Sequence, residues 1–113
     1  MNLEAGLPGL SLFTPADGLA EGEIDPTADL SDGHQEMNAF ANRLIEACLP
    51  ASEWRLSAFS IDWSGLTPAG QLYGQAWLER AGTSVSFARF RLCDSGGRLV
   101  AAGSATAHNA DPT

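Results

Sequence analysis

Apolar or small side chains recur at helical spacing between residues 37 and 49 of this sequence. The positions are Met37, Phe40, Ala41, Leu44, Ile45, Cys48 and Leu49. They fit the i, i+3, i+4, i+7, i+8 spacing of an amphipathic helix at every step. Ser31 or Asp32 is placed to cap the start of this helix, and Pro50 is placed to end it. The sequence therefore predicts one long helix that buries a single face.

After Pro50 the apolar pattern changes to the alternation that is typical of β-strands. Four such segments cover residues 53–63, 71–80, 84–93 and 98–108. Short turns rich in Gly, Pro and Asp separate them, so the sequence predicts an antiparallel meander in which each strand pairs with the next. An earlier segment, residues 18–24, alternates small or apolar residues with acidic ones, and we expect it at an edge of the sheet.

One helix and several consecutive strands indicate an α+β architecture, in which the helix covers the apolar face of a single antiparallel sheet. The length of 113 residues fits one domain, so we expect residues 1–113 to form a single unit. Residues 1–16 contain two prolines and two glycines. We expect this segment to be an irregular N-terminal lead-in, with at most a short extended piece at residues 10–13.

The charge of the chain excludes several classes of partner. The net charge is −8, and all six basic residues are arginines. A nucleic-acid-binding protein needs a basic surface that neutralises phosphates, and an anionic membrane attracts basic segments, so neither partner is expected. No apolar run is long enough to span a bilayer. The first residues lack the basic and apolar regions of a secretory signal, so we expect a cytoplasmic protein.

The two cysteines, Cys48 and Cys93, both lie within apolar patterns. We interpret them as free thiols that are buried in the fold, because a pair so far apart in the chain shows no disulfide motif. The sequence contains no CxxC motif and no Cys/His spacing of the kind that holds zinc. We therefore expect no metal site.

Three motifs in the second half of the chain resemble those of hotdog-fold thioesterases. The first is a Pro/Gly turn that leads into a strand, LTPAGQLYGQAWL. The second is an R-x-G-x-S-x-x-F tract formed by Arg80, Gly82, Ser84 and Phe87. The third is a D-x-x-G-x-L-V-A hairpin formed by Asp94, Gly97, Leu99, Val100 and Ala101. The resemblance spans residues 18–108 and implies a hotdog fold, in which the sheet wraps around one long central helix. It also implies homodimers, or dimers of such dimers forming homotetramers, with acyl-thioester sites at the dimer interface.

The resemblance places the candidate catalytic residues at and beyond the start of the helix. The pair Gly33-His34 stands where the superfamily often has a Gly-His element, so His34 would orient or polarise the thioester or move a proton. Asp32 is the preferred carboxylate for activating water, and Asp29 is a second candidate in the same loop. Glu46 could reach a site shared with His34 of the other subunit. Each carboxylate also has a structural explanation, as a cap, a turn residue or an ion-pair partner on a solvated helix face.

Five further residues are candidates for substrate binding. Gly33 and Gln35 would offer backbone N–H groups to the carbonyl oxygen, at the positive end of the helix dipole. Asn38 lies on the polar face of the same helix. Arg80 and Arg91 would bind the phosphates of coenzyme A, for which guanidinium groups are well suited. Their alternative role is to keep the outer face of the sheet soluble.

The first functional hypothesis is a hydrolase that cleaves an acyl-coenzyme A or related thioester, with coenzyme A as part of the substrate and no other cofactor. A second is a dehydratase or enoyl hydratase of the same fold, which the segment Leu44-Ile45-Glu46-Ala47 after Gly33-His34 resembles. A third is a non-catalytic protein that binds acyl thioesters. It is motivated by Gln35 and Glu36, which replace the two glycines of the common His-Gly-Gly element. Arg43 further supports it, because one thioesterase branch has a carboxylate there.

Overall fold

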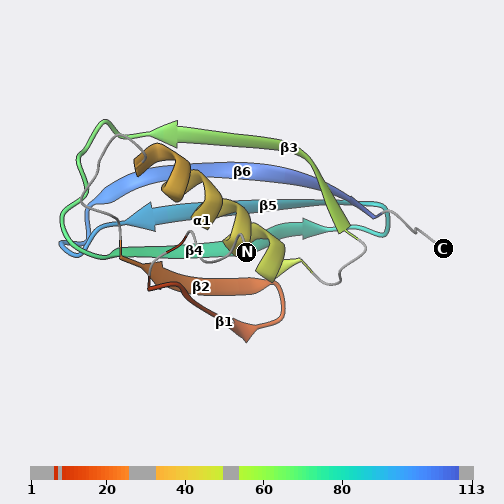
Figure 1. The fold of residues 1–113 in the computed structure, drawn as a ribbon. Helices are drawn as coiled ribbons and strands as arrows, with labels where there is room; N and C mark the ends of the chain where they lie inside the picture. Colours follow the sequence, from red (N-terminus) through yellow and green to blue (C-terminus); the bar gives the residue numbers. More distant parts are fainter. Residues whose placement is uncertain (1–6, 8, 26–32, 50–53, 110–113) are drawn as a thin grey trace, which may run out of the picture.

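The computed structural model describes residue 7 and residues 9–25, 33–49 and 54–109. In chain order the elements are β1 (Ser11–Ala16), β2 (Leu19–Ile24), α1 (Gly33–Cys48), β3 (Trp54–Trp63), β4 (Leu72–Ala81), β5 (Val85–Cys93) and β6 (Leu99–Asn109). The strands form one antiparallel sheet in the order β1-β2-β4-β5-β6-β3. Figure 1 shows α1 lying obliquely across one face of this sheet. The predicted α+β architecture is confirmed.

The predicted helix is confirmed, and its apolar face forms the centre of the core. Met37, Phe40, Ala41, Leu44, Ile45 and Cys48 are all buried. Beneath them, Gly22 of β2 lies directly opposite Gly74 of β4. A Cβ atom at Gly74 would lie 3.0 Å from the ring of Phe40, and one at Gly22 would lie 3.3 Å from it. The two glycines therefore let α1 approach the sheet closely.

The predicted meander of the last four strands was wrong for β3, which was expected to pair with β4. β4, β5 and β6 form a meander as predicted, but β3 pairs with β6, with Trp63 opposite Ala101. The reason is competition for edges. β4 has two edges, and β5 and β2 occupy them, so β3 is left to pair with the remaining edge of β6. The segment between β3 and β4 therefore crosses the end of the sheet and does not close a hairpin.

The predictions for the N-terminal region were also partly wrong. Residues 11–16 form β1, which is longer than the short extended piece expected at residues 10–13. β1 pairs with β2, so β2 is an inner strand and β1 takes the edge. Pro15 argued against a strand here, because proline cannot donate to a ladder. An edge strand tolerates it, and the register of β1 shifts between Phe13 and Ala16.

Asp94 holds the turn between β5 and β6 and ties it to the loop before β4. Its buried carboxylate accepts hydrogen bonds from the backbone N–H groups of Ala69 (3.2 Å), Gly96 (3.0 Å) and Arg98 (3.1 Å). The Arg98 guanidinium adds an ion pair at 2.8 Å. Burial opposes ionisation of this carboxyl, but the hydrogen bonds from Arg98, Ala69 and Gly96 outweigh it. They lower the pKa of Asp94 from 3.8 to about 2.

This arrangement predicts an acid-dependent loss of stability. A carboxyl whose pKa is lowered by folding stabilises the native state above its ordinary pKa, and this contribution disappears as the pH falls towards the folded value. Urea unfolding of wild type and Asp94→Asn should therefore show a difference in unfolding free energy that is full above about pH 4 and shrinks towards pH 2. Asp62→Asn, at an exposed position of β3, is the control and should follow wild type. A difference that stays constant across this pH range would contradict the assignment.

Candidate functional site

The start of α1 is the first component of the candidate site. Gly33 is the first residue of the helix and His34 the second. The first N–H groups of a helix have no acceptor within it, and the helix dipole makes this end favourable for negative charge. Gln35 and Asn38 are exposed on the first turns. Four of the predicted residues thus lie together, at a position that can bind an oxygen atom carrying developing negative charge.

Two predicted carboxylates and one side chain fall outside the described residues. Asp29 and Asp32 belong to the segment 26–32, and only the helical backbone of His34 is described, not its side chain. The roles expected for Asp32 and His34 therefore stay predictions.

Glu46 does not lie near the start of α1 within one protomer. It is exposed, and it follows His34 by twelve residues along the same helix. A rise of 1.5 Å per residue separates the two backbone positions by about 18 Å. Any joint action of Glu46 and His34 therefore requires one residue from each of two subunits.

Sequence reasoning did not identify an apolar strip on the side of β3 that faces α1. The strip consists of Leu56, Phe59, Ile61 and Trp63, all only half-buried. Phe59 stacks on the buried Phe90 of β5, with ring centroids 5.4 Å apart. The strip is incompletely covered because α1 packs mainly on β1, β2, β4 and β5. The alternation at residues 59, 61 and 63 was a readable signal, whereas a register shift between Leu56 and Ala58 hid the fourth member.

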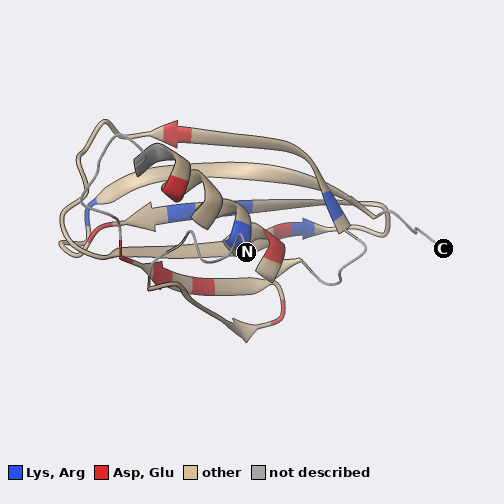
Figure 2. Ribbon diagram, viewed as in Figure 1, with Lys and Arg blue, Asp and Glu red and all other residues tan. Residues whose placement is uncertain are grey.

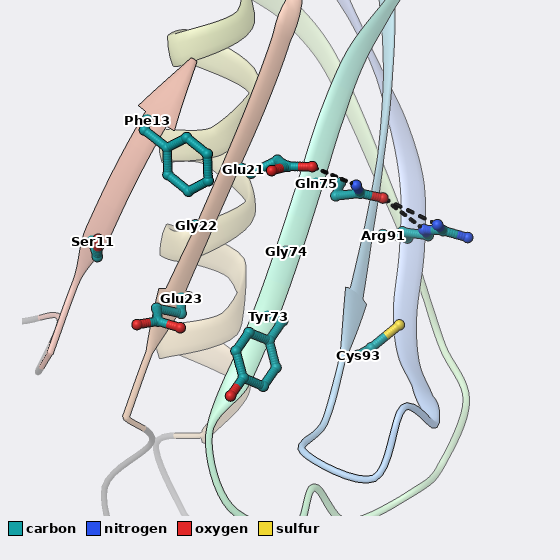
Figure 3. Close-up of a pocket in the computed structure, with 10 residues that line it drawn as sticks. All are labelled: Ser11, Phe13, Glu21, Gly22, Glu23, Tyr73, Gly74, Gln75, Arg91 and Cys93. Carbon is teal, nitrogen blue, oxygen red and sulfur yellow. Dashed lines mark hydrogen bonds between the residues drawn. The ribbon is translucent and has the colours of Figure 1, made fainter. Parts of the chain in front are cut away.

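Arg80 and Arg91 lie on the other face of the sheet, which we call the outer face. Arg91 donates two hydrogen bonds to Gln75 Oε1, at 3.0 and 3.2 Å, and Gln75 Nε2 donates to Glu21 Oε2 at 2.7 Å (Figure 3). Arg80 is exposed near the end of β4, opposite Phe87. Within one protomer the sheet therefore separates both arginines from the start of α1.

The outer face also carries a groove of about 410 Å³ across β1, β2, β4 and β5. Phe13, Glu23 and Tyr73 line it beside the Glu21–Gln75–Arg91 chain (Figure 3). In Figure 2 the acidic residues of β2 and the basic residues of β5 lie on separate strands with β4 between them. The groove thus has an acidic side and a basic side.

Both cysteines are free thiols, as predicted. Cys48 is buried at the end of α1, and burial raises the pKa of its thiol from 9.0 to about 11, although a backbone hydrogen bond partly opposes this. A thiol with such a pKa is a poor nucleophile at neutral pH. Cys93 was expected to be buried, but it is only half-buried, because it lies on the outer face of the sheet. In the described ranges, no three His, Cys, Asp or Glu side chains are grouped so that they could hold a metal ion. No helix in those ranges is long and apolar enough to cross a bilayer.

Comparison with known proteins gives a clear answer for the fold. No protein-family model and no curated protein sequence matches this chain. Among solved structures, the Escherichia coli PaaI protein from the phenylacetic acid degradation operon superposes with a TM-score of 0.81 at 19% identity, covering 96% of this chain and 84% of that one. The TT0310 protein of Thermus thermophilus gives 0.81 at 18% identity, with 96% and 99% coverage.

A third similar structure contains a ligand. It is a hypothetical thioesterase protein with coenzyme A from Streptococcus pneumoniae, with a TM-score of 0.75, 10% identity and coverage of 88% and 84%. At these identities the three likenesses establish a shared fold, and that fold agrees with the one that the sequence motifs predicted.

Proposed function

Because the chain has the hotdog fold, we propose that it hydrolyses the thioester bond of an acyl-coenzyme A or a related acyl thioester. The observation that carries this proposal is the start of α1, at Gly33, above a sheet face whose β3 strip is only half-buried. The helix start offers N–H donors for a carbonyl oxygen, and the strip offers an apolar surface for an acyl chain. One similar structure is named a thioesterase and contains coenzyme A, which supports the same interpretation.

The proposed reaction uses the residues at the helix start. Backbone N–H groups of Gly33 and Gln35 would stabilise the oxyanion that forms when water attacks the carbonyl carbon. Asp32 would take the proton from that water, and His34 would orient the thioester or transfer a proton. The C–S bond then breaks, the sulfur is protonated, and the products are a carboxylic acid and the free thiol. Asn38 would contact the substrate beside the oxyanion site.

We propose that the site is completed by a second subunit. Among the described strands, β3 pairs only with β6, so its ten residues Trp54–Trp63 form an edge of the sheet. Pairing of β3 with its copy would satisfy this edge and cover the half-buried strip. Arg80 and Arg91 could bind coenzyme A phosphates only for a substrate that reaches the outer face from a neighbouring protomer.

The test is an assay of free thiol release from a panel of short-chain, long-chain and aromatic acyl-coenzyme A substrates. We expect release from at least one of them, with no dependence on added metal or cofactor. Hydration of crotonyl-coenzyme A without thiol release would instead identify a hydratase. Saturable binding of the panel with neither reaction would identify a non-catalytic acyl-thioester-binding protein.

A further inference from the structure

We infer that the groove on the outer face of the sheet is a binding site for a small organic cation, an ammonium or guanidinium group carried on an apolar body. The groove has a volume of about 410 Å³, which is within the range of small-ligand sites. Its lining combines two aromatic rings, Phe13 and Tyr73, with the carboxylate of Glu23 (Figure 3). The proposed hydrolysis uses none of these three side chains, so this site is additional to the one at the start of α1.

The strand register places these three side chains close together. Glu23 of β2 lies directly opposite Tyr73 of β4, and the neighbours of both residues along their strands are buried, so both side chains point away from α1. Phe13 of β1 is opposite Glu21, which lies two residues before Glu23 on the same face of β2. Directly opposite residues have Cβ atoms about 5 Å apart, and diagonal neighbours are about 7 to 8 Å apart, within reach of an aromatic side chain. Figure 3 shows the ring of Phe13 on one side of β2 and the ring of Tyr73 on the other. A cation bound by Glu23 would therefore lie within reach of both rings.

The charges that line the groove favour a cation as the ligand. Gln75 connects Arg91 to Glu21, because it accepts from the guanidinium group at 3.0 and 3.2 Å and donates to the carboxylate at 2.7 Å. Within the described ranges, the carboxylate of Glu23 has no such hydrogen bond and no ion pair. It is also half-buried, so fewer water molecules can solvate it. A cationic ligand would supply the missing charge-assisted hydrogen bond, and the net charge of −8 favours its approach.

The two rings favour an organic cation over a metal ion. Phe13 is 55% exposed and Tyr73 is 44% exposed, so much of each ring is accessible to a ligand. The Tyr73 hydroxyl donates to Gln71 Oε1 at 3.0 Å, which holds this ring beside the groove. The faces of aromatic rings attract cations, and the rings also cover the apolar part of an organic ligand. A metal ion would need several oxygen, nitrogen or sulfur ligands, and the described residues contain no suitable group of three His, Cys, Asp or Glu side chains.

The test is a titration with n-butylammonium, phenethylammonium and ethylguanidinium, followed by the backbone amide signals in two-dimensional NMR spectra. We expect saturable shifts at residues 22–23 and 73–74 with at least one of these probes. Butyrate is the control for chain length, because it carries the opposite charge, and we expect no saturable shift at these residues with it. A tripeptide with a central lysine and blocked ends presents the same ammonium group on a protein chain. We expect it to bind no more tightly than the free amines.

Three variants identify the side chains that hold the cation. Glu23→Gln keeps the shape of the side chain and removes its charge, so we expect the dissociation constant to rise about tenfold. Phe13→Leu and Tyr73→Leu each remove one ring, and each should weaken binding by about two- to fivefold, the usual size of a cation–π contact at a partly exposed site. Asp17→Asn, at an exposed position in the turn between β1 and β2, removes an equal charge and should bind like wild type. Circular dichroism and the thermal midpoint of each variant confirm that it is folded.

Several results would contradict this inference. They are the absence of saturable shifts in the groove with every cationic probe, binding of butyrate as tight as that of n-butylammonium, and a folded Glu23→Gln variant with wild-type affinity. Tighter binding of the tripeptide than of every free amine would overturn the assignment to a small molecule and identify a lysine side chain of another protein as the ligand. All of these readouts follow binding and not thiol release, so failure here is distinguishable from failure of the proposed function.

Discussion

Replacing His34 by alanine is expected to reduce thioester hydrolysis by about 10²- to 10⁴-fold, the usual contribution of a positioned acid–base group. His34 is the second residue of α1, beside the N–H groups proposed to bind the oxyanion. The effect should fall mainly on kcat, because the imidazole would act on the reacting carbonyl and not on the rest of the substrate. Helix formation should be unaffected, because alanine has a higher helix propensity than histidine.

The chain provides its own control for this experiment. His108 is the other histidine; it is exposed on β6, where its Nδ1 lies 2.7 Å from Ser57 Oγ. His108→Ala should leave kcat and KM within about twofold of wild type, since surface substitutions away from a site have small effects. Steady-state rates of thiol release across a pH series would measure both variants. Full activity of a folded His34→Ala protein would remove His34 from the site.

Replacing Phe40 by alanine is expected to lower the free energy of unfolding by about 4 kcal/mol. Phe40 is fully buried, and its ring occupies the space above Gly22 and Gly74, where neither strand supplies a side chain. Neither glycine can fill the cavity that the substitution creates. The contacts of the ring with the strands at Gly22 and Gly74 would be lost.

Equilibrium urea unfolding, followed by tryptophan fluorescence, measures this loss. Phe40→Leu keeps most of the apolar volume, and it should cost about 1 kcal/mol and remain folded if the alanine variant does not. A loss below about 1 kcal/mol for Phe40→Ala would show that the sheet closes over the gap, and that the ring is not the main contact between the two layers.

The elements of this fold could be predicted better than their arrangement. The helix was readable because its periodicity is a local property of residues 37–49, and the strands were readable from their alternation. Pairing is decided by competition between strands that are distant in the sequence. The place of β3 beside β6 depends on β2 occupying the edge of β4. β1 was underestimated because the penalty for Pro15 disappears at the edge of a sheet.

The candidate site shows the same limit. The motif at Gly33-His34 located the helix start, which the structure describes as the first turn of α1. The outer face of the sheet was the alternative prediction for Arg91, and the structure places it there, because its neighbours Phe90 and Leu92 are apolar and buried. Arg91 was predicted to bind the same substrate as the helix start because a guanidinium group suits phosphate. The sheet, however, lies between Arg91 and the helix start. The alternation of side chains along a strand therefore predicts which residues share a face of the sheet better than their chemistry does.

The pairing of β3 with β6 has a consequence for synthesis of the chain. Trp54 lies opposite Asn109 and Trp63 opposite Ala101, so β3 is translated well before its partner strand. A growing chain must therefore hold an unpaired strand with four apolar residues on one face while residues 64–98 are added. Unpaired strands of this kind are sites of aggregation during folding. During the time between translation of β3 and of β6, β3 is present without the strand that pairs with it. The yield of folded protein in cells should therefore be most sensitive to the length of this interval.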